Sequence, residues 1–408
     1  MKSKARKTDV QRYEDYKRKY ELMGKEMYFE FNVDKENGIV SIDNYIPNDE
    51  EFRVIEIPPF VSKIDIRWSK YGRKIPMFYD VEQSLKVINK NNRIKDMSCM
   101  FYNFLGKELD LSEFDTTGAE DMSNMFEACV SLKKLDLSRF NTSKVKNMNG
   151  MFNFCMLLKK IRVNMFDTSN VKDMHGMFSS CYSITELDLS NFDTSKVTDM
   201  GNMFELCKKL KELNISNFNT SKVKDMSNMF MECMNLRELD LRSFDTSNVK
   251  DMSCMFTDCK RIKNIDLSRF KGDSVTLMSS MFAYCCSLEC LDMHNFSAYN
   301  LSSVESMFYG CKEMREIDLS NMYTHSVKKK NMLEGCIKLE KLTICMVSED
   351  SKKHEEAEGT EYHVPVKAVK KEKSDRMFYR MFYKCDCLTE INTEDSDIRA
   401  RAHFESKR

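Results

Sequence analysis

The sequence has few of the residues that interrupt regular structure, and its charges cancel. Only 12 of its 408 residues are glycine, 5 are proline and one is tryptophan, whereas 42% are hydrophobic. This composition excludes a disordered chain and allows a long apolar core. Lys plus Arg and Asp plus Glu both number 64, so the net charge is zero. The chain-wide basic footprint of a nucleic-acid-binding protein is therefore absent.

Long apolar runs and targeting signals are also missing. No run approaches the ~18 apolar residues that a membrane-spanning helix needs. The first 24 residues, MKSKARKTDVQRYEDYKRKYELMG, contain basic side chains but no apolar stretch like that of a secretory signal. No lipidation pattern is visible. These features predict a cytoplasmic location without membrane insertion.

One motif recurs along most of the chain. LDLSNFDTSKVTDMGNMFELC, residues 187–207, returns as LDLSRFNTSKVKNMNGMFNFC from Leu135 and as LDLRSFDTSNVKDMSCMFTDC from Leu239. Aligned on the Met-Phe pair, the strong copies fall at Phe101, Phe126, Phe152, Phe178, Phe204, Phe230, Phe256, Phe282 and Phe308, and weaker ones at Leu333 and Phe382. Seven of the steps are 26 residues long. Such a period predicts a solenoid of about eleven units, which bury their apolar faces against one another.

Each unit divides into two halves. L-x-x-L-x-L-x-x-F alternates like a short strand with one buried face. D-M-x-x-M-F-x-x-C places apolar residues at offsets 0, 3, 4 and 7, as on one side of a short helix with an Asp N-cap. D/N-T-S-x-V between them is typical of a side-chain-bonded turn. We therefore expect an α/β leucine-rich-repeat solenoid, with one continuous parallel β-sheet (about residues 109–344) on the concave face and short helices on the convex face.

The chain divides into four regions. Residues 1–93 combine a charged helix or tail, a hairpin centred on Asn37-Gly38 and a β cap for the open end of the array. Residues 94–345 form the solenoid. The charge-dense segment 346–376 interrupts the period and is expected to be a loop insertion. Residues 377–408 hold the last repeat and a C-terminal tail.

The string L-D-L-S-x-F-D-T-S-x-V-x-D-M-S-x-M-F-x-x-C resembles the BspA-like leucine-rich repeats of bacterial surface proteins. The resemblance covers residues 94–345 and resumes at about 377–393, and IEIPPFVSKIDI (residues 55–66) is similar to a sister repeat type. It implies a non-enzymatic protein that binds other proteins, for example in adhesion or co-aggregation. It also implies a cell-surface or secreted protein, an alternative to the cytoplasmic location above.

Cysteine is the most regular of the reactive residues. Ten of the 16 cysteines share one phase of the repeat: Cys129, Cys155, Cys181, Cys207, Cys233, Cys259, Cys285, Cys311, Cys336 and Cys385. Stacked repeats would place them in a ladder ~5 Å apart, but parallel side chains in a tight core rarely adopt the disulfide dihedral. We expect buried, reduced thiols. No zinc spacing, HExxH motif, catalytic triad order, phosphate loop or dinucleotide motif is present, which indicates no enzyme, metal or cofactor.

Charge on the strand face provides the candidate binding site. The middle residue of L-x-L should face outward, and this column reads Asp110, Asp136, Arg162, Asp188, Asn214, Asp240, Asp266, Asp292, Asp318 and Thr343. Two residues earlier come Glu186, Glu212, Glu238 and Glu316, but Lys134 and Lys160 near the start. Neighbouring like charges oppose each other, so this column carries a cost. We hypothesise that a protein partner with a basic surface binds at Glu186, Asp188, Glu212, Glu238, Asp240 and Asp266, with Lys160 and Arg162 in a basic spot beside them.

A lysine-rich edge supports alternative interpretations. The turn positions that flank the recurring Val carry Lys144, Lys146, Lys172, Lys196, Lys222, Lys224 and Lys250. Nucleic-acid binding along this edge is one alternative, but interleaved aspartates and few exposed aromatics argue against it. Repeat duplication could also have copied charges that solvent screens. The main hypothesis is a protein–protein interaction scaffold, either a cytosolic inhibitor, immunity or effector-type binder or a surface adhesin.

Overall fold

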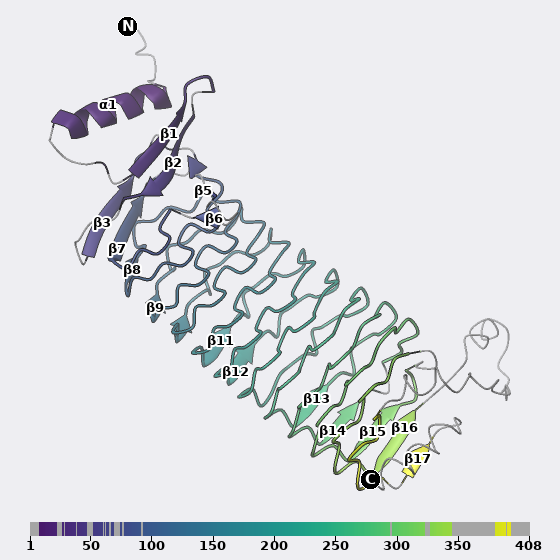
Figure 1. The fold of residues 1–408 in the computed structure, drawn as a ribbon. Helices are drawn as coiled ribbons and strands as arrows, with labels where there is room; N and C mark the ends of the chain where they lie inside the picture. Colours follow the sequence, from purple (N-terminus) through teal and green to yellow (C-terminus); the bar gives the residue numbers. More distant parts are fainter. Residues whose placement is uncertain are drawn as a thin grey trace, which may run out of the picture. The chain divides into compact units, whose positions relative to one another are not determined.

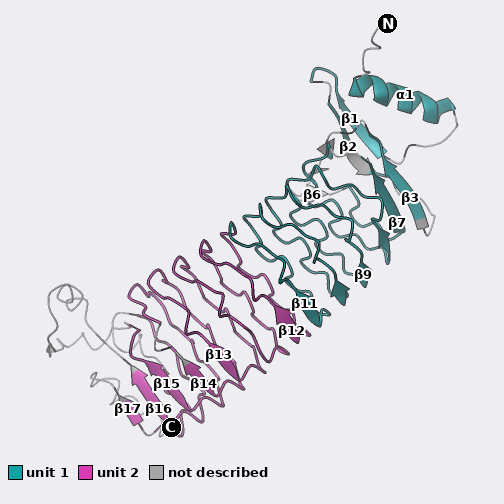
Figure 2. Cartoon of the chain, turned by 180° about the vertical axis from the view of Figure 1, so that it is seen from behind, with its two compact units in different colours: residues 1–196 teal, residues 197–408 magenta. Residues whose placement is uncertain are grey.

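The structure is a computed structural model. It describes residues 8–22, 27, 29–37, 39–46, 52–59, 61, 63–64, 67–68, 74–75, 77–90, 93–293, 296–322, 327–344, 380–388 and 390–392. The chain forms two compact units, residues 1–196 and 197–408 (Figure 2). The loop insertion predicted at 346–376 lies outside the described residues.

The first unit begins with a helix and a hairpin (Figure 1). Helix α1 (Asp9–Leu22) precedes the antiparallel pair β1 (Phe29–Asp34) and β2 (Ile39–Tyr45). Oδ1 of Asp34 accepts hydrogen bonds from the backbone N–H groups of Glu36 and Asn37, both at 3.0 Å. This side-chain-bonded turn closes the hairpin, so the β hairpin predicted around Asn37 is confirmed. Three short strands follow it: β4 (Lys63–Ile64), parallel to β2, and the antiparallel pair β5 (Arg67–Trp68) and β6 (Lys74–Ile75).

Parallel strands from successive repeats define the strand face of the first unit. Strands β3 (Phe52–Ile57), β7 (Ser84–Asn89) and β8 (Leu109–Asp110) form one sheet. Strands β9 (Lys134–Leu135) and β10 (Lys160–Ile161) form a second, and β11 (Glu186–Asp188) follows. The repeat architecture is already present before residue 94, because the Phe78 ring stacks on Phe101 at 5.1 Å and 5°.

The second unit repeats this arrangement. Its strands are β12 (Glu212–Asn214), β13 (Asn264–Asp266), β14 (Cys290–Asp292), β15 (Glu316–Leu319), β16 (Lys341–Ile344) and β17 (Glu390–Asn392). Strands β13 to β17 form one parallel sheet, whereas residues 238–240 form no strand. The prediction of one continuous sheet was therefore wrong. Strands of two to four residues contribute few ladder bonds, and most of the bonding between repeats lies on the opposite wall.

That wall consists of β-turns, where short helices were predicted. Met125 N–H donates to Met122 O at 3.3 Å and Cys129 N–H to Phe126 O at 3.2 Å, which closes two consecutive turns. The third residues of these turns, Asn124 and Ala128, have φ of 55° and 60°. A residue with positive φ in every fourth position prevents a right-handed helix. Within the described repeats of either unit no α-helix is present.

The turns replace helical hydrogen bonds by bonds between repeats. The N–H groups of Met122, Asn124, Phe126 and Ala128 donate to carbonyls of the next repeat at 2.7–3.0 Å. An α-helix would direct these same groups to its own carbonyls. The turn wall therefore holds the stack together as a sheet would. The predicted leucine-rich-repeat solenoid is confirmed, with stacked turns opposite the strands.

Equivalent side chains form ladders through both cores. The Phe126 and Phe152 rings stack at 5.7 Å and 0°, and the Phe230 and Phe256 rings at 5.5 Å and 11°. All ten cysteines of the predicted column are buried and free, and the Cys259 thiol donates to Phe230 O at 3.1 Å. Burial raises the pKa of the Cys336 thiol to about 12. The predicted cysteine ladder is confirmed.

Buried threonines add a polar ladder. Thr116, 1% exposed, donates through Oγ1 to Asn141 O at 2.9 Å and accepts from Asn141 N–H at 2.8 Å. Thr220 and Thr246 make the corresponding bonds in the second unit at 2.8 Å. Each of these threonines therefore joins two repeats, which explains why a polar residue occupies a buried position.

Candidate binding surface

The aspartate column of the strand face has a structural role in forming turns. Oδ1 of Asp136 accepts the backbone N–H of Ser138 at 2.9 Å, and Oδ1 of Asp188 accepts that of Ser190 at 3.1 Å. Backbone and side-chain hydrogen bonds from Ser138 hold the pKa of Asp136 below its ordinary value. These local bonds stabilise each carboxylate, so the column is not simply the costly ladder of like charges that we expected.

The second unit shows that this turn needs an oxygen acceptor and no charge. Asn214 occupies the same column, and its Oδ1 accepts from Ser216 N–H at 3.3 Å. Asp266 accepts from Ser268 N–H at 2.9 Å. The Asp/Asn exchange at this position is the signal in the sequence that could have identified the turn. The fold therefore does not require the negative charge of these aspartates.

The residues of the basic spot predicted in the first unit are exposed. Lys134 and Lys160 are register partners in strands β9 and β10, and both are exposed. Nζ of Lys160 forms an ion pair with Glu186 of the next repeat. Arg162 is exposed and helps to lower the pKa of Asp136. Glu186 therefore presents an ion pair to the solvent, and its neighbours on β9 and β10 are cationic.

The hypothesised acids of the second unit differ from one another. Arg242 forms a two-point contact with Asp240, Nε to Oδ1 at 2.9 Å and Nη2 to Oδ2 at 2.7 Å. These side-chain bonds lower the pKa of Asp240 to about 2. Glu212 and Glu238 are exposed, and no hydrogen bond or ion pair of theirs is found among the described residues of this unit. Among the four hypothesised acids of this unit, these two glutamates therefore lack such compensation.

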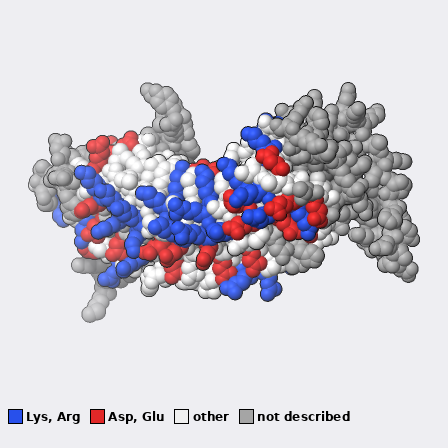
Figure 3. All heavy atoms as spheres, turned by 90° about the horizontal axis from the view of Figure 1, so that it is seen from below, with Lys and Arg blue, Asp and Glu red and all other residues white. Residues whose placement is uncertain are grey.

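Ion pairs between repeats are a feature that the sequence analysis missed. Lys263 binds Glu289 at 2.9 Å, Arg315 binds Glu340 at 3.2 Å, and Lys341 binds Glu316 at 2.6 Å. The partners stand 25 or 26 residues apart, one repeat in the sequence. Figure 3 shows one face of the molecule, on which Lys and Arg side chains gather with Asp and Glu side chains beside them.

The lysine-rich edge is likewise partly neutralised. In the first unit Glu120 lies between Lys95, at 2.9 Å, and Lys146, at 2.7 Å. Hydrogen bonds from both ammonium groups, that of Lys146 first, lower the pKa of Glu120 to about 2. Lys196 donates to Asn170 Oδ1 at 2.7 Å. This part of the edge is therefore a mixed array of charges and amides.

In the second unit the same edge is more basic. Lys222, Lys224 and Lys250 are exposed there. The last two occupy one column, because Lys250 N–H donates to Lys224 O at 2.8 Å. The carboxylates of Asp225 and Asp251 follow directly in the chain, and their Oδ1 atoms accept turn N–H groups at 2.8 Å.

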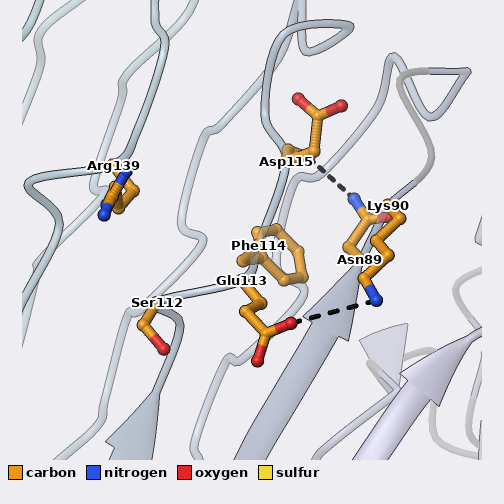
Figure 4. A pocket seen from close by; sticks show the side chains of 7 residues that line it. All are labelled: Asn89, Lys90, Ser112, Glu113, Phe114, Asp115 and Arg139. Atoms are coloured by element: carbon orange, nitrogen blue, oxygen red, sulfur yellow. Dashed lines mark hydrogen bonds and ion pairs between the residues drawn. The ribbon is translucent and has the colours of Figure 1, made fainter.

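A shallow hollow of about 420 Å³ lies at the start of the array, lined by Asn89, Lys90, Ser112, Glu113, Phe114, Asp115 and Arg139. Figure 4 shows Arg139 on one side and Asn89 and Lys90 on the other. Asn89 is fully buried and donates to Asp115 O at 2.7 Å. Glu113 pairs with Lys86 at 2.8 Å and with Lys90 at 3.9 Å. The lining of the hollow is therefore mostly polar and charged.

Chemistry of other kinds finds no support in the described part of the chain. No group of three His, Cys, Asp or Glu side chains there is placed to hold a metal ion. His175 is half-buried, and the other five histidines lie outside the described residues. None of the described helices is long and apolar enough to cross a membrane.

The fold and its surface define a leucine-rich-repeat protein whose exposed columns carry paired and unpaired charges. The chain belongs to the family described as "Mycoplasma protein of unknown function, DUF285", whose model matches residues 75–186, 154–264 and 234–343. A comparison with curated proteins gave no match.

Several solved structures are similar to this chain. A leucine-rich cell surface protein from Faecalibacterium prausnitzii is 17% identical, with 92% of this chain and 96% of that chain covered and a TM-score of 0.38. A leucine-rich repeat protein from Bacteroides ovatus is 15% identical, with coverages of 91% and 99% and a TM-score of 0.42. The functional domain of InlJ from Listeria monocytogenes, which includes a cysteine ladder, is 14% identical, with coverages of 71% and 65% and a TM-score of 0.18.

Proposed function

We propose that this chain is a non-enzymatic scaffold that binds a protein partner through its strand face, with BspA-like repeats as the frame. Residues 94–345 supply the binding solenoid in this proposal, and residues 1–93 cap it. One observation carries it. The buried Met, Phe and Cys columns are nearly constant between repeats, whereas the exposed column two residues before the outward-facing Asp varies among Lys, Glu, Asn and Cys.

Such variation on a constant frame is what a specific interface requires. Side chains whose identity the fold does not fix can be selected for a partner at little cost in stability. Glu212 and Glu238 fit this description best, because they are exposed and make no bond that the repeat needs. Asp240 and Asp266 add charge in the adjacent column, and Glu186 and Asp188 add it in the first unit. The partner surface that suits these residues is basic.

The test begins with capture of partners on the tagged whole chain and mass spectrometry. Association rates of a captured protein are then measured with wild type and with the Glu212→Gln/Glu238→Gln variant at two salt concentrations. We expect the variant to associate about tenfold more slowly at low salt, with a smaller difference at high salt. Asp273→Asn, which neutralises an exposed carboxylate on the lysine-rich edge, is the matched control. Equal, salt-insensitive rates for all three chains would exclude the strand face.

Nucleic-acid binding is the second candidate because Lys222, Lys224 and Lys250 gather on one edge of the second unit. Fluorescence anisotropy with a single-stranded RNA and a DNA duplex tests it directly. A salt-sensitive affinity that falls when Lys224 and Lys250 are replaced by Gln would favour this function. Fractionation of the source cells separates a cytosolic inhibitor, immunity or effector-type binder from a surface adhesin.

A further inference from the structure

In the first unit, the residues around the ladder cysteine, which form one corner of each repeat, are uncharged in three consecutive repeats. The stretches from one residue before the cysteine to two after it read ACVS (128–131), FCML (154–157) and SCYS (180–183). In the second unit, six of the seven equivalent stretches contain a charged residue. Solvent-facing positions of a copied repeat have therefore become apolar in one place.

The large apolar and aromatic side chains of these stretches lie in stacked repeats, and we name them together the corner patch: Val130, Phe154, Met156, Leu157 and Tyr182. Phe154 is 40% exposed and Leu157 43%, and the other three are half-buried. Backbone bonds between the repeats, such as Phe154 N–H to Ser179 O at 3.0 Å, fix their stacking. With ~4.8 Å between repeats, the patch extends ~10 Å along the stack. That length matches two turns of a bound helix or three residues of a bound strand.

The equivalent corner of the second unit is closed by ion pairs. Lys208 binds Glu232 at 3.0 Å, Lys260 binds Asp258 at 3.2 Å, and Lys338 binds Glu313 at 2.7 Å. These pairs keep that corner hydrated and polar. The corner patch has no such pairs, so a partner could cover it without removing a charge from water.

A basic rim borders the corner patch. Lys133 and Lys159 follow it by two or three residues, and Lys134 and Lys160 come next in the chain. Lys159 N–H donates to Lys133 O at 3.4 Å, so these two lysines stand in one column. Lys160 is paired with Glu186, whereas no ion pair of Lys133, Lys134 or Lys159 is found among the described residues of the first unit. Like charges this close repel each other, and a bound anionic group would relieve the repulsion.

We propose that the corner patch and its basic rim dock an acidic, amphipathic segment of a protein partner. Apolar side chains of the segment would cover Phe154, Leu157 and Val130, and its carboxylates would meet Lys133 and Lys159. An anionic membrane has similar chemistry but needs protruding side chains that enter the bilayer. Phe154 and Leu157 do not protrude in this way, because more than half of each surface is buried. A half-buried apolar surface with positive charges near it in the chain suits an amphipathic helix or strand.

Selection from a random-peptide display library tests this chemistry while the natural partner is still unidentified. The whole chain is the target, and a Phe154→Ser/Leu157→Ser chain removes binders to other surfaces. Serine is the residue that the fold itself uses at these positions, in Ser180, whose φ is 57°, and in Ser131. We expect the enriched peptides to combine Asp or Glu with Phe, Leu or Trp.

An enriched peptide is then synthesised and its affinity measured by fluorescence anisotropy. We expect at least tenfold weaker binding to the Phe154→Ser/Leu157→Ser chain and to a Lys133→Glu/Lys159→Glu chain. Tyr284→Ser, which removes a 43% exposed aromatic from the same column of the second unit, is the matched control and should bind like wild type. Circular dichroism confirms that each variant is folded.

Two results would contradict this proposal, and a third would assign the patch to another partner. Failure to enrich acidic peptides, or equal affinity for the Phe154→Ser/Leu157→Ser chain, would overturn the proposal. Sedimentation with phosphatidylserine vesicles that depends on Phe154, without any selected peptide, would assign the patch to a membrane instead. The strand-face proposal is tested separately, because the Glu212→Gln/Glu238→Gln chain should retain full affinity for the selected peptide.

Discussion

Replacement of Cys259 tests how much the cysteine ladder contributes to stability. Its side chain is completely buried, its thiol donates to Phe230 O at 3.1 Å, and burial holds its pKa well above the ordinary value for a thiol. Alanine removes the sulfur and this weak hydrogen bond. Aspartate instead inserts a carboxylate into a position that the fold has made apolar, between the repeats of Cys233 and Cys285.

General transfer and cavity free energies give the expected losses of stability. Removing one buried group the size of a methylene costs about 0.8 kcal/mol in transfer free energy. A residual cavity of roughly 25 Å³ adds about 0.6 kcal/mol at ~24 cal/mol per Å³. Cys259→Ala should therefore lower the free energy of unfolding by about 1.4 kcal/mol. Cys259→Asp should cost several times more, because a carboxyl group is buried there without a partner designed for it.

Urea unfolding of the whole chain, followed by far-ultraviolet circular dichroism, measures both variants. Native-state labelling with a thiol reagent and peptide mapping gives an independent readout, in which exposed Cys290 and Cys387 should react long before buried Cys233 or Cys285. The thiolate is the reactive form, and burial keeps its population low. A Cys259→Asp chain with the wild-type urea midpoint, or labelling of Cys233 as fast as Cys290, would refute this account of the ladder.

Three further predictions follow from the turns. Asn228 has φ of 57°, so Asn228→Val should lower the free energy of unfolding by about 1–2 kcal/mol. Asn228→Gly should be nearly neutral. A valine variant with the wild-type stability in urea unfolding would contradict the turn geometry. Thr220→Val should lower the free energy of unfolding by about 1–3 kcal/mol, because Asp245 O loses the hydroxyl that donates to it at 2.8 Å. Equal thermal midpoints for wild type and this variant would exclude a stabilising role for the threonine ladder. The pKa of Asp240 falls from 3.8 to about 2 in the folded chain. Its contribution to the free energy of unfolding is therefore complete above pH ~4 and is lost as the pH falls towards ~2. Urea midpoints measured between these pH values should decline less for Asp240→Asn than for wild type, and parallel declines would show that Asp240 does not contribute.

The repeat period predicted the core but not the wall that carries Met203 and Phe204. Their column is buried as expected. The helix was wrong because apolar offsets of 0, 3, 4 and 7 fit two consecutive turns as well as one helical face. The distinguishing signal was the residue before the second Met, which is Gly150 or Gly176 in two repeats and Asn228 in another, all with φ of 57°. Glycine and asparagine at one phase of a repeat indicate a left-handed residue.

The candidate site, like the fold, was predicted only in part from the sequence. The outward orientation of Glu186, Asp188, Glu212 and Glu238 was predicted from alternation alone, and all four are exposed. That the aspartates accept turn N–H groups could not be read from charge, because Asp and Asn serve equally in such a turn. Their role in partner binding stays a prediction.

By itself, the sequence determined which side chains enter the core, because a 26-residue period repeats the same inward positions regardless of the local conformation between them. It also determined the hairpin around Asn37, where the turn chemistry is local. Only the tertiary structure decided which exposed charges neutralise each other, as Lys160 does with Glu186. These contacts depend on how one repeat stacks on the next, and that stacking is fixed by backbone bonds that every residue type can make.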